Sequence, residues 1–262
     1  AVEIYTYARA LALQASGSRL LDVGASAQPP AAELVGARRP TAGGLDAGTF
    51  AAAGAAVGFD TDDHGSNGWA IGRDRVEGAE GSLLFANPHF PWEGELRFAE
   101  THLTVPGEFD IYGAQLLGVP GVGIGFTDGV AWTHTGAAGK RLTGYNLTLD
   151  PASPTSYLVD GVSVPMTATR ITIEILRPDE TIDTETRTMW SSEYGPIIDF
   201  PGIGWSTTNV LTYRDANIDN DEFVEQYARL SDIETIDDLV ALNAEYQGVP
   251  LFNTVAADSE GN

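Results

Sequence analysis

From residue 67 onward, apolar and polar residues alternate in short runs that Gly, Pro, Asn and Asp separate. Alternation at every second position gives a β-strand one buried face and one exposed face, and the separating residues are typical of turns. The pattern predicts strands over residues 67–72, 81–86, 98–105, 110–116, 130–135, 145–149, 157–159, 170–176, 184–190, 210–213 and 251–257. Most of the chain is therefore expected to be β-structure.

Helical spacing of apolar residues occurs in three other segments. Residues 221–230 and 236–246 each place their apolar side chains on one face, and residues 2–16 predict an earlier helix. Residues 24–58 are rich in Ala, Gly and Pro and predict a linker or a loosely packed helix rather than a core element. Many strands followed by helices indicate the α+β class.

Composition excludes several classes of function. Hydrophobic residues make up 43% of the 262, which is enough for a core, and 14 Lys and Arg against 37 Asp and Glu give a net charge of −23. This charge argues against nucleic acid and anionic membrane surfaces as partners, since proteins bind both of these anionic partners through Lys and Arg side chains. No apolar run reaches the roughly 18 residues of a membrane-spanning helix, so no membrane insertion is expected. Without Cys there is no thiolate metal site or Cys nucleophile.

Common catalytic motifs are missing from the sequence. The four histidines do not form a His-Glu-x-x-His motif, and no Gly-x-Ser-x-Gly nucleophile elbow occurs. Gly121, Gly123 and Gly125 alternate with apolar residues, but no helical pattern follows. We therefore interpret them as a tight strand against neighbouring backbone rather than as a dinucleotide site.

Two segments, around Ser66 and His89, offer more specific chemistry. Ser66 stands where a polar stretch becomes a strand, so it occupies an exposed junction that backbone cleavage could uncover. His89 lies between two Pro residues and next to the aromatic residues Phe90 and Trp92. Either motif alone has a simpler interpretation, a turn serine or a hydrogen-bonded loop histidine.

Further motifs follow these two in a defined order, at residues 103–107, 125–126, 131–135, 194–196, 214–217, 247–250 and 253–258. Together, over roughly residues 60–262, they resemble the penicillin acylase family of N-terminal nucleophile hydrolases. The resemblance is strongest to the branch of acyl-homoserine lactone acylases and aculeacin-type acylases. Residues 1–65 resemble the end of the family's α subunit with its linker, and residues 66–262 the N-terminal part of its β subunit.

The resemblance implies an incomplete αββα fold and self-cleavage before a serine, here at Gly65–Ser66. Ser66 then begins the β subunit, and its free α-amine acts as the base for its own hydroxyl. An α-amine has an ordinary pKa of about 7.7–8.0, so it can serve as a base near neutral pH. The resemblance also implies a heterodimer of α and β subunits in a periplasmic or extracellular location.

Site residues carry over by position. His89 matches a family histidine close to the nucleophile, although its spacing of 89 − 66 = 23 is one longer than expected, which predicts a bulge within residues 81–86. The backbone N–H of Gly136 matches an oxyanion donor, with Gly where the family often has a larger residue. The second oxyanion donor, an Asn, falls beyond residue 262. Asn253 is interpreted as a polar residue that fixes a strand.

Substrate choice stays open at this stage. Phe90, Trp92 and Trp190 could line an acyl pocket, although an ordinary aromatic core explains them equally well. The substrate would be a small N-acyl amide, and an acyl-homoserine lactone, a lipopeptide and a β-lactam all fit. Neither a metal nor another cofactor is expected. The alternative is a non-catalytic extracellular β-rich binding or structural module in which Ser66 never becomes a terminus.

Overall fold

The computed structural model describes residues 24–30, 65–78, 80–93, 96–137, 142–200, 204–217, 219–250 and 252–262. They belong to two compact units. Unit 1 contains the described residues of 65–137 and 219–262, and unit 2 those of 24–30 and 142–217. The expected helix over residues 2–16 and most of the expected linker lie outside the described residues.

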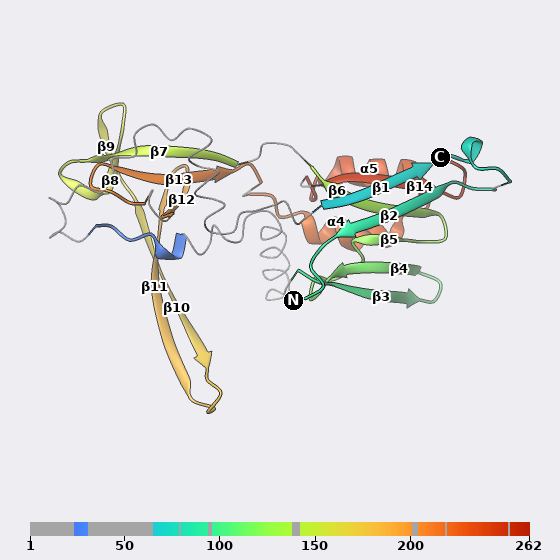
Figure 1. Ribbon diagram of the computed structural model, residues 1–262, viewed down its shortest axis with the longest axis horizontal. Coiled ribbons are helices and arrows are strands. Elements are labelled where there is room, and N and C mark those ends of the chain that lie inside the picture. The colour runs from blue at the N-terminus through green and yellow to red at the C-terminus, as the bar shows by residue number, and fades with distance from the viewer. Residues whose placement is uncertain are drawn as a thin grey trace. The chain divides into compact units, whose positions relative to one another are not determined.

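Unit 1 is built on a five-stranded antiparallel sheet with the order β14-β6-β5-β4-β3 (Figure 1). Its strands are β3 (Phe98–Val105), β4 (Phe109–Leu116), β5 (Ile124–Phe126), β6 (Val130–Gly136) and β14 (Phe252–Asp258). Helix α4 (Phe223–Arg229), the short helix η3 (Leu230–Asp232) and helix α5 (Ile236–Tyr246) cover one face. The core between them joins Trp132 and Ile111 of the sheet to Tyr227, Leu230 and Leu239 of the helices.

Helix α5 begins and ends where the sequence pattern predicts. Thr235 and Asp238 form a capping box, in which the Asp238 backbone N–H donates to Thr235 Oγ1 at 3.2 Å and the Thr235 N–H donates to Asp238 Oδ2 at 2.9 Å. Gln247 ends the helix in the left-handed conformation, with φ of 50°.

A two-stranded sheet covers the other face of the five-stranded sheet. It pairs β1 (Gly65–Ile71) with β2 (Leu83–His89), and both strands contact β6 and β14. A Cβ at Gly68 would lie only 2.9 Å from the Thr133 side chain of β6 and in ordinary contact with Val255 of β14, so glycine permits the two sheets to approach closely. The described residues of unit 1 thus supply a helix layer and two sheet layers.

The pairing of β1 with β2 is continuous from Gly65 opposite His89 to Ile71 opposite Leu83. The bulge expected within residues 81–86 is therefore wrong, because a bulge would place two residues opposite one. The connection between the strands, which contains the helix η2 (Arg73–Arg75), can take up a difference in length without changing the register.

Close backbone approach explains Gly125, the last of the three alternating glycines, together with Gly113 of the neighbouring strand. A side chain at Gly125 would collide with the backbone of Tyr112 and Gly113, and one at Gly113 with the backbone of Ile124 and Gly125. The interpretation of this motif as a tight strand is confirmed for Gly125, since Ile124–Phe126 form β5, paired with β4 and β6. It is wrong for Gly121 and Gly123, which precede β5: Gly121 has a φ of 88°, and Gly123 lies against the side chain of Gln115.

Unit 2 is a seven-stranded antiparallel sheet with the order β10-β11-β12-β13-β7-β8-β9. Its strands are β7 (Leu142–Asp150), β8 (Ser153–Val159), β9 (Val162–Pro165), β10 (Thr167–Leu176), β11 (Ile182–Ser192), β12 (Gly195–Ile198) and β13 (Asn209–Asp215). Trp205, Tyr157 and Ile197 are fully buried in its core together with Ala27. Ala27 lies in the segment expected to stay out of the core, so that expectation is wrong for this part of the segment.

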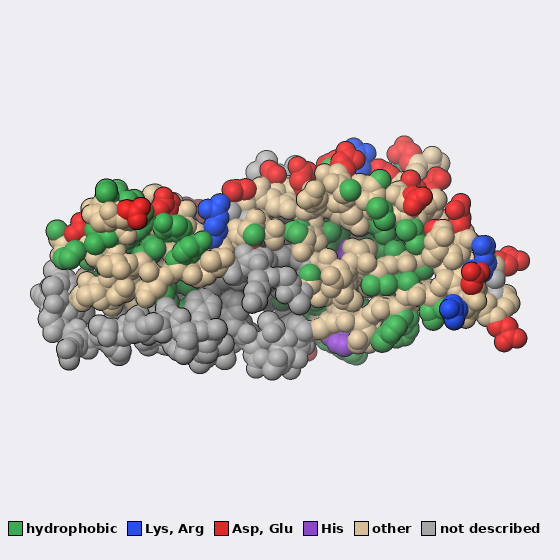
Figure 2. All heavy atoms as spheres, turned by 90° about the horizontal axis from the view of Figure 1, so that it is seen from above, with side chains coloured by type: hydrophobic (Ala, Val, Ile, Leu, Met, Phe, Trp, Pro, Cys, Tyr) green, Lys and Arg blue, Asp and Glu red, His purple; other side chains and the backbone are tan. Residues whose placement is uncertain are grey.

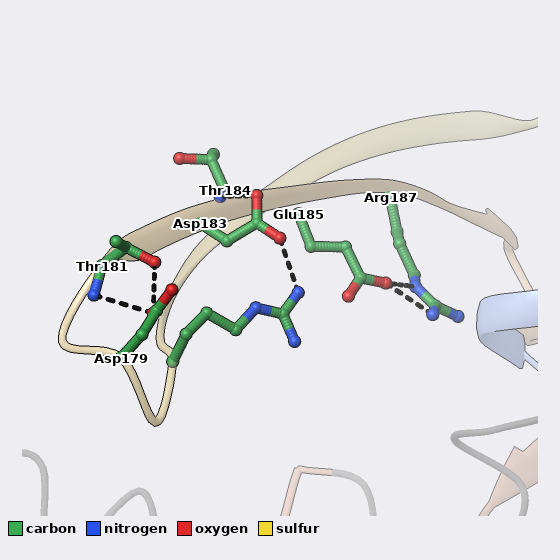
Figure 3. Close-up of polar contacts among 7 residues, drawn as sticks. Asp179, Thr181, Asp183, Thr184, Glu185 and Arg187 are labelled. Atoms are coloured by element: carbon green, nitrogen blue, oxygen red, sulfur yellow. Dashed lines mark hydrogen bonds and ion pairs between the residues drawn. The ribbon is translucent and has the colours of Figure 1, made fainter.

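Strands β10 and β11 form a long hairpin whose side chains are mostly exposed. Figure 3 shows the polar contacts near its tip: Asp179 accepts hydrogen bonds from the N–H and hydroxyl of Thr181, and Asp183 pairs with Arg177 at 2.5 Å. A second exposed ion pair joins Glu185 and Arg187 at 2.5 Å. Exposed ion pairs of this kind contribute little to the free energy of folding, so the hairpin does not depend on them for its stability.

Candidate active site

Ser66 is the second residue of β1, and its Oγ donates a hydrogen bond to the carbonyl oxygen of Gly65. Side chains alternate along a strand, so Ser66 and Gly68 share one face of β1. Gly68 faces Thr133 and Val255 of the five-stranded sheet. The Ser66 hydroxyl therefore leaves β1 on the face that packs on that sheet.

Strand direction shows which end of the five-stranded sheet lies under Ser66. Gly68 is next to Val255 and Gly72 is next to Gly261, so β1 and β14 run the same way (Figure 1). Strand β14 pairs antiparallel with β6, with Phe252 opposite Gly136. The first residues of β1 thus lie toward the end of the sheet where β14 begins and β6 ends.

His89 ends β2 directly opposite Gly65, on the face of the β1–β2 sheet that points away from the five-stranded sheet. Its Nε2 lies 3.0 Å from Nδ2 of Asn67 and 3.2 Å from Nδ2 of Asn87. A Cβ at Gly65 would be only 3.2 Å from Nδ1 of His89. The His89 imidazole and the Ser66 hydroxyl leave the β1–β2 sheet on opposite faces. The imidazole therefore lies next to Gly65, on one side of the Gly65–Ser66 bond, and not next to the Ser66 hydroxyl.

Gly136 is the last residue of β6, and a side chain there would meet nothing within 4 Å. Asn253 of β14 donates from Nδ2 to the carbonyl oxygen of Gly136 at 3.2 Å and to Oγ1 of Thr135 at 3.4 Å. The interpretation of Asn253 as a residue that fixes a strand is consistent with these two contacts. The assignment of the Gly136 N–H as an oxyanion donor stays a prediction.

His134, two residues before Gly136, is buried on the helix side of β6. Its Nδ1 lies 3.2 Å from Thr254 Oγ1, its ring stacks on Phe252 with centroids 5.4 Å apart, and its Nε2 has no partner among the described residues. Burial lowers the pKa of His134 from 6.5 to about 4, because the charged imidazolium would lose its hydration. The neutral ring therefore acts as a packing residue beneath this end of the sheet.

The three aromatic residues predicted to line an acyl pocket lie in different surroundings. Phe90 packs against the core of unit 1, with its ring 5.2 Å from that of Phe98, whereas Trp92 is 95% exposed. Trp190 packs in the core of unit 2, edge-on to Trp205 at 5.6 Å. An aromatic-core role accounts for Phe90 and Trp190, and a pocket made by all three stays a prediction.

On the face that Figure 2 shows, acidic side chains outnumber Lys and Arg and lie mainly along the upper edge and the right-hand end of the described part. Among the described residues, no three His, Asp or Glu side chains are grouped so as to hold a metal ion. None of the described helices combines the length and the apolarity required to cross a bilayer.

The polar partners around this end of β1 were not predicted by the sequence motifs. Asn67 and Asn87 are opposite each other in the β1–β2 register, and each is two or fewer positions from Ser66 or His89. The contact of these asparagines with His89 depends on the strand register, which the sequence does not show. The only sequence signal that could have indicated them is that they stand close to Ser66 and His89 in the chain.

Comparison with known proteins identifies the family. The sequence profile of the penicillin amidase family matches residues 2–262. The chain belongs to this family. The resemblance seen in the sequence is thereby confirmed.

Among curated relatives, the chain is 43% identical over 200 residues to the acyl-homoserine lactone acylase PvdQ of Pseudomonas fluorescens, which covers 76% of this chain and 26% of the relative. It is 38% identical over 230 residues to the PvdQ of Pseudomonas putida, covering 87% and 30%. It is 34% identical over 233 residues to the aculeacin-A acylase of Actinoplanes utahensis, covering 87% and 29%. The chain thus spans between a quarter and a third of the length of these relatives.

Among solved structures, a thermostable penicillin G acylase from Alcaligenes faecalis matches with a TM-score of 0.60 and 16% identity, over 74% of this chain and 33% of that one. This likeness concerns the fold alone. It confirms the predicted α+β class and the N-terminal nucleophile hydrolase fold, of which the described residues form part. The expected division at residues 65 and 66 is a matter of cleavage chemistry and stays a prediction.

Proposed function

We propose that the whole protein is an acylase, an amide hydrolase that removes the acyl chain from a small N-acyl substrate. Ser66 is its N-terminal nucleophile, freed by self-cleavage of the Gly65–Ser66 bond. Membership of the penicillin amidase family and relatives named as acylases support the reaction class.

The observation that carries the proposal is the hydrogen bond from Ser66 Oγ to the carbonyl oxygen of Gly65. It holds the hydroxyl against the same carbonyl group that self-cleavage must attack. Attack by Oγ on the Gly65 carbonyl carbon forms an ester while the bond to the Ser66 nitrogen breaks. Water then hydrolyses the ester, which releases Gly65 with a free carboxylate and leaves Ser66 with a free amine.

Once freed, the Ser66 amine acts as the general base for the hydroxyl in substrate hydrolysis. The position of His89 supports this assignment, since its imidazole and the hydroxyl leave the β1–β2 sheet on opposite faces. A serine–histidine pair of the usual kind requires the two side chains within hydrogen-bond reach of each other. A base on the nucleophile's own residue needs no such partner.

The tetrahedral intermediate requires donors for its oxyanion, and removing one such donor typically costs about 3–4 kcal/mol. The N–H of Gly136 is assigned as one donor. Gly136 ends β6, and the first residues of β1 lie toward that end of the sheet. A side-chain amide from the part of the β subunit beyond residue 262 supplies the other. His89 completes the catalytic group on the Gly65 side.

Of the three aromatic residues expected to line an acyl pocket, Trp92 has the exposed side chain that can contact the acyl chain, whereas Phe90 and Trp190 pack against the cores of their own units. Acyl-homoserine lactones, lipopeptides and β-lactams are the substrate classes to test, and the names of the relatives in hand favour the first two. The mature enzyme is a heterodimer of α and β subunits, is periplasmic or extracellular, and uses no metal or other cofactor.

The test uses the full-length protein with Ser66 intact, with Ser66→Ala and with Ser66→Cys. Each is assayed for self-cleavage by gel and for release of fatty acid from N-acyl amides of graded chain length. Ser66→Ala is expected to lose both activities, whereas Ser66→Cys keeps some cleavage because a thiol can perform the same shift. Acylase activity in an uncleaved Ser66→Ala protein would exclude the mechanism.

A further inference from the structure

We propose that Asn67 and Asn87 are positioning residues that hold the His89 imidazole with its proton on Nδ1, the nitrogen that faces Gly65. The inference rests on the proposed self-cleavage at Gly65–Ser66. It assigns a role to two residues that neither the sequence motifs nor the proposed mechanism uses.

The placement of the two asparagine amides favours one tautomer of His89. The amide nitrogens of Asn67 and Asn87 lie 3.0 Å and 3.2 Å from Nε2 of His89. An amide nitrogen donates and does not accept, so in this arrangement the lone pair of Nε2 is shared between the two donors and Nε2 carries no proton. A neutral imidazole has one N–H, which must then be on Nδ1.

The strand register directs this N–H toward Gly65, the residue before the bond to be cut. Asn67 and Asn87 form a cross-strand pair, and the next pair on the same face is Gly65 with His89. The Nε2 side of the ring contacts the two asparagines, which leaves Nδ1 toward Gly65. A Cβ on residue 65 would lie only 3.2 Å from Nδ1, so the absence of a side chain at Gly65 is what leaves room for the ring.

A neutral donor at this place matches the charge that self-cleavage creates. Attack by Ser66 Oγ turns the Gly65 carbonyl into a tetrahedral intermediate with negative charge on its oxygen, and a fixed N–H donor lowers the energy of such a charge. The proton of the hydroxyl passes to the Ser66 nitrogen as the C–N bond breaks, and His89 keeps its own proton throughout. The opposite tautomer would present a lone pair to Gly65 and would give no stabilisation.

The test replaces both asparagines by leucine in the full-length precursor. Leucine has nearly the same shape and no charge but cannot donate a hydrogen bond, so the double variant Asn67→Leu/Asn87→Leu removes both donors to Nε2 and no longer holds the proton on Nδ1. Asn146→Leu is the control, since it makes the same kind of substitution at an exposed asparagine of β7 in unit 2. Self-cleavage is timed by gel, and melting temperatures are taken on the same variants carrying Ser66→Ala.

We expect the double variant to cleave at least about tenfold more slowly, which corresponds to about 1.4 kcal/mol in the barrier. The control should cleave within twofold of wild type, and the melting temperatures should agree. A double variant that cleaves within twofold of wild type overturns the inference. Failure of the proposed function would look different, as cleavage in the Ser66→Ala protein.

A second measurement decides the matter if the double variant fails to fold. The Ser66→Ala precursor is labelled with ¹⁵N-histidine, and the His89 ring signals are assigned by their loss in the His89→Gln variant. The ¹⁵N shifts distinguish a protonated ring nitrogen from an unprotonated one. A protonated Nδ1 with a bare Nε2 supports the inference, and a protonated Nε2 overturns it whatever the cleavage rate.

Discussion

Asn253 donates from Nδ2 to the carbonyl oxygen of Gly136 across 3.2 Å, although 117 positions separate the two residues. The contact ties the start of β14 to the end of β6. On its other side, as far as the structure describes the chain, β6 pairs with β5 through Ala131 and Trp132, near the start of β6. Asn253 therefore helps to restrain the opposite end of β6, beyond the part that β5 pairs with.

Replacing Asn253 by Ala should therefore loosen Gly136 and reduce turnover in the full-length enzyme. One hydrogen bond of this kind contributes about 1 kcal/mol, so kcat for an N-acyl amide should fall about fivefold. Asn220→Ala is the control, because Asn220 makes the same kind of contact, from Nδ2 to the Gln247 carbonyl at 2.8 Å, elsewhere in unit 1. An equal loss in both variants would contradict a specific role for Asn253.

Two substitutions of Gly136 distinguish the effect of its backbone N–H on activity from the effect of adding a side chain. Gly136→Ala keeps the N–H and places a methyl group in open space, so activity should stay within about twofold of wild type. Gly136→Pro removes the N–H and should cut kcat by roughly a hundred- to a thousandfold. Steady-state kinetics on the cleaved forms checks both. If Gly136→Pro retains full activity, the oxyanion assignment is wrong.

The sequence predicted long elements better than short ones. The bounds of α5 follow from its apolar spacing, and both ends are as predicted. By contrast β5, β9 and β12 have three or four residues, too few for an alternating pattern to show. Their positions depend on neighbouring strands, which the local sequence does not reveal.

The candidate site shows the same division. Ser66 and His89 could be named as candidates from the sequence because their motifs are local, and their roles stay predictions. The contact of Asn253 with Gly136 depends on how β14 pairs with β6, and that of Asn67 with His89 depends on the β1–β2 register. Side-chain partners that a register brings together leave no periodic signal in the chain.

Burial of His134 should make unit 1 sensitive to acid. Its pKa is lowered from 6.5 to about 4 in the folded protein. Above pH 6.5 the His134 ring is neutral in the folded and in the unfolded protein, so it does not lower the free energy of unfolding. As the pH falls from 6.5 toward 4, the unfolded chain takes up a proton that the folded one does not, which costs up to about 1.4 kcal/mol per pH unit.

The melting temperature of the Ser66→Ala precursor should accordingly fall between pH 7.5 and pH 4.5, and His134→Phe should reduce that fall. His102→Gln serves as the control, because the His102 side chain is 57% exposed and pairs with Asp110 at the surface. An unchanged pH dependence in His134→Phe would show that the buried histidine is not its source.

The most direct test of the central claim is the intact mass of the full-length protein together with the N-terminal sequence of its fragments. The account predicts two chains in the active protein, the second beginning at Ser66, and a single uncut chain with no acylase activity when Ser66 is replaced by Ala. An active protein that remains one chain, or a second chain that begins at another residue, would contradict it.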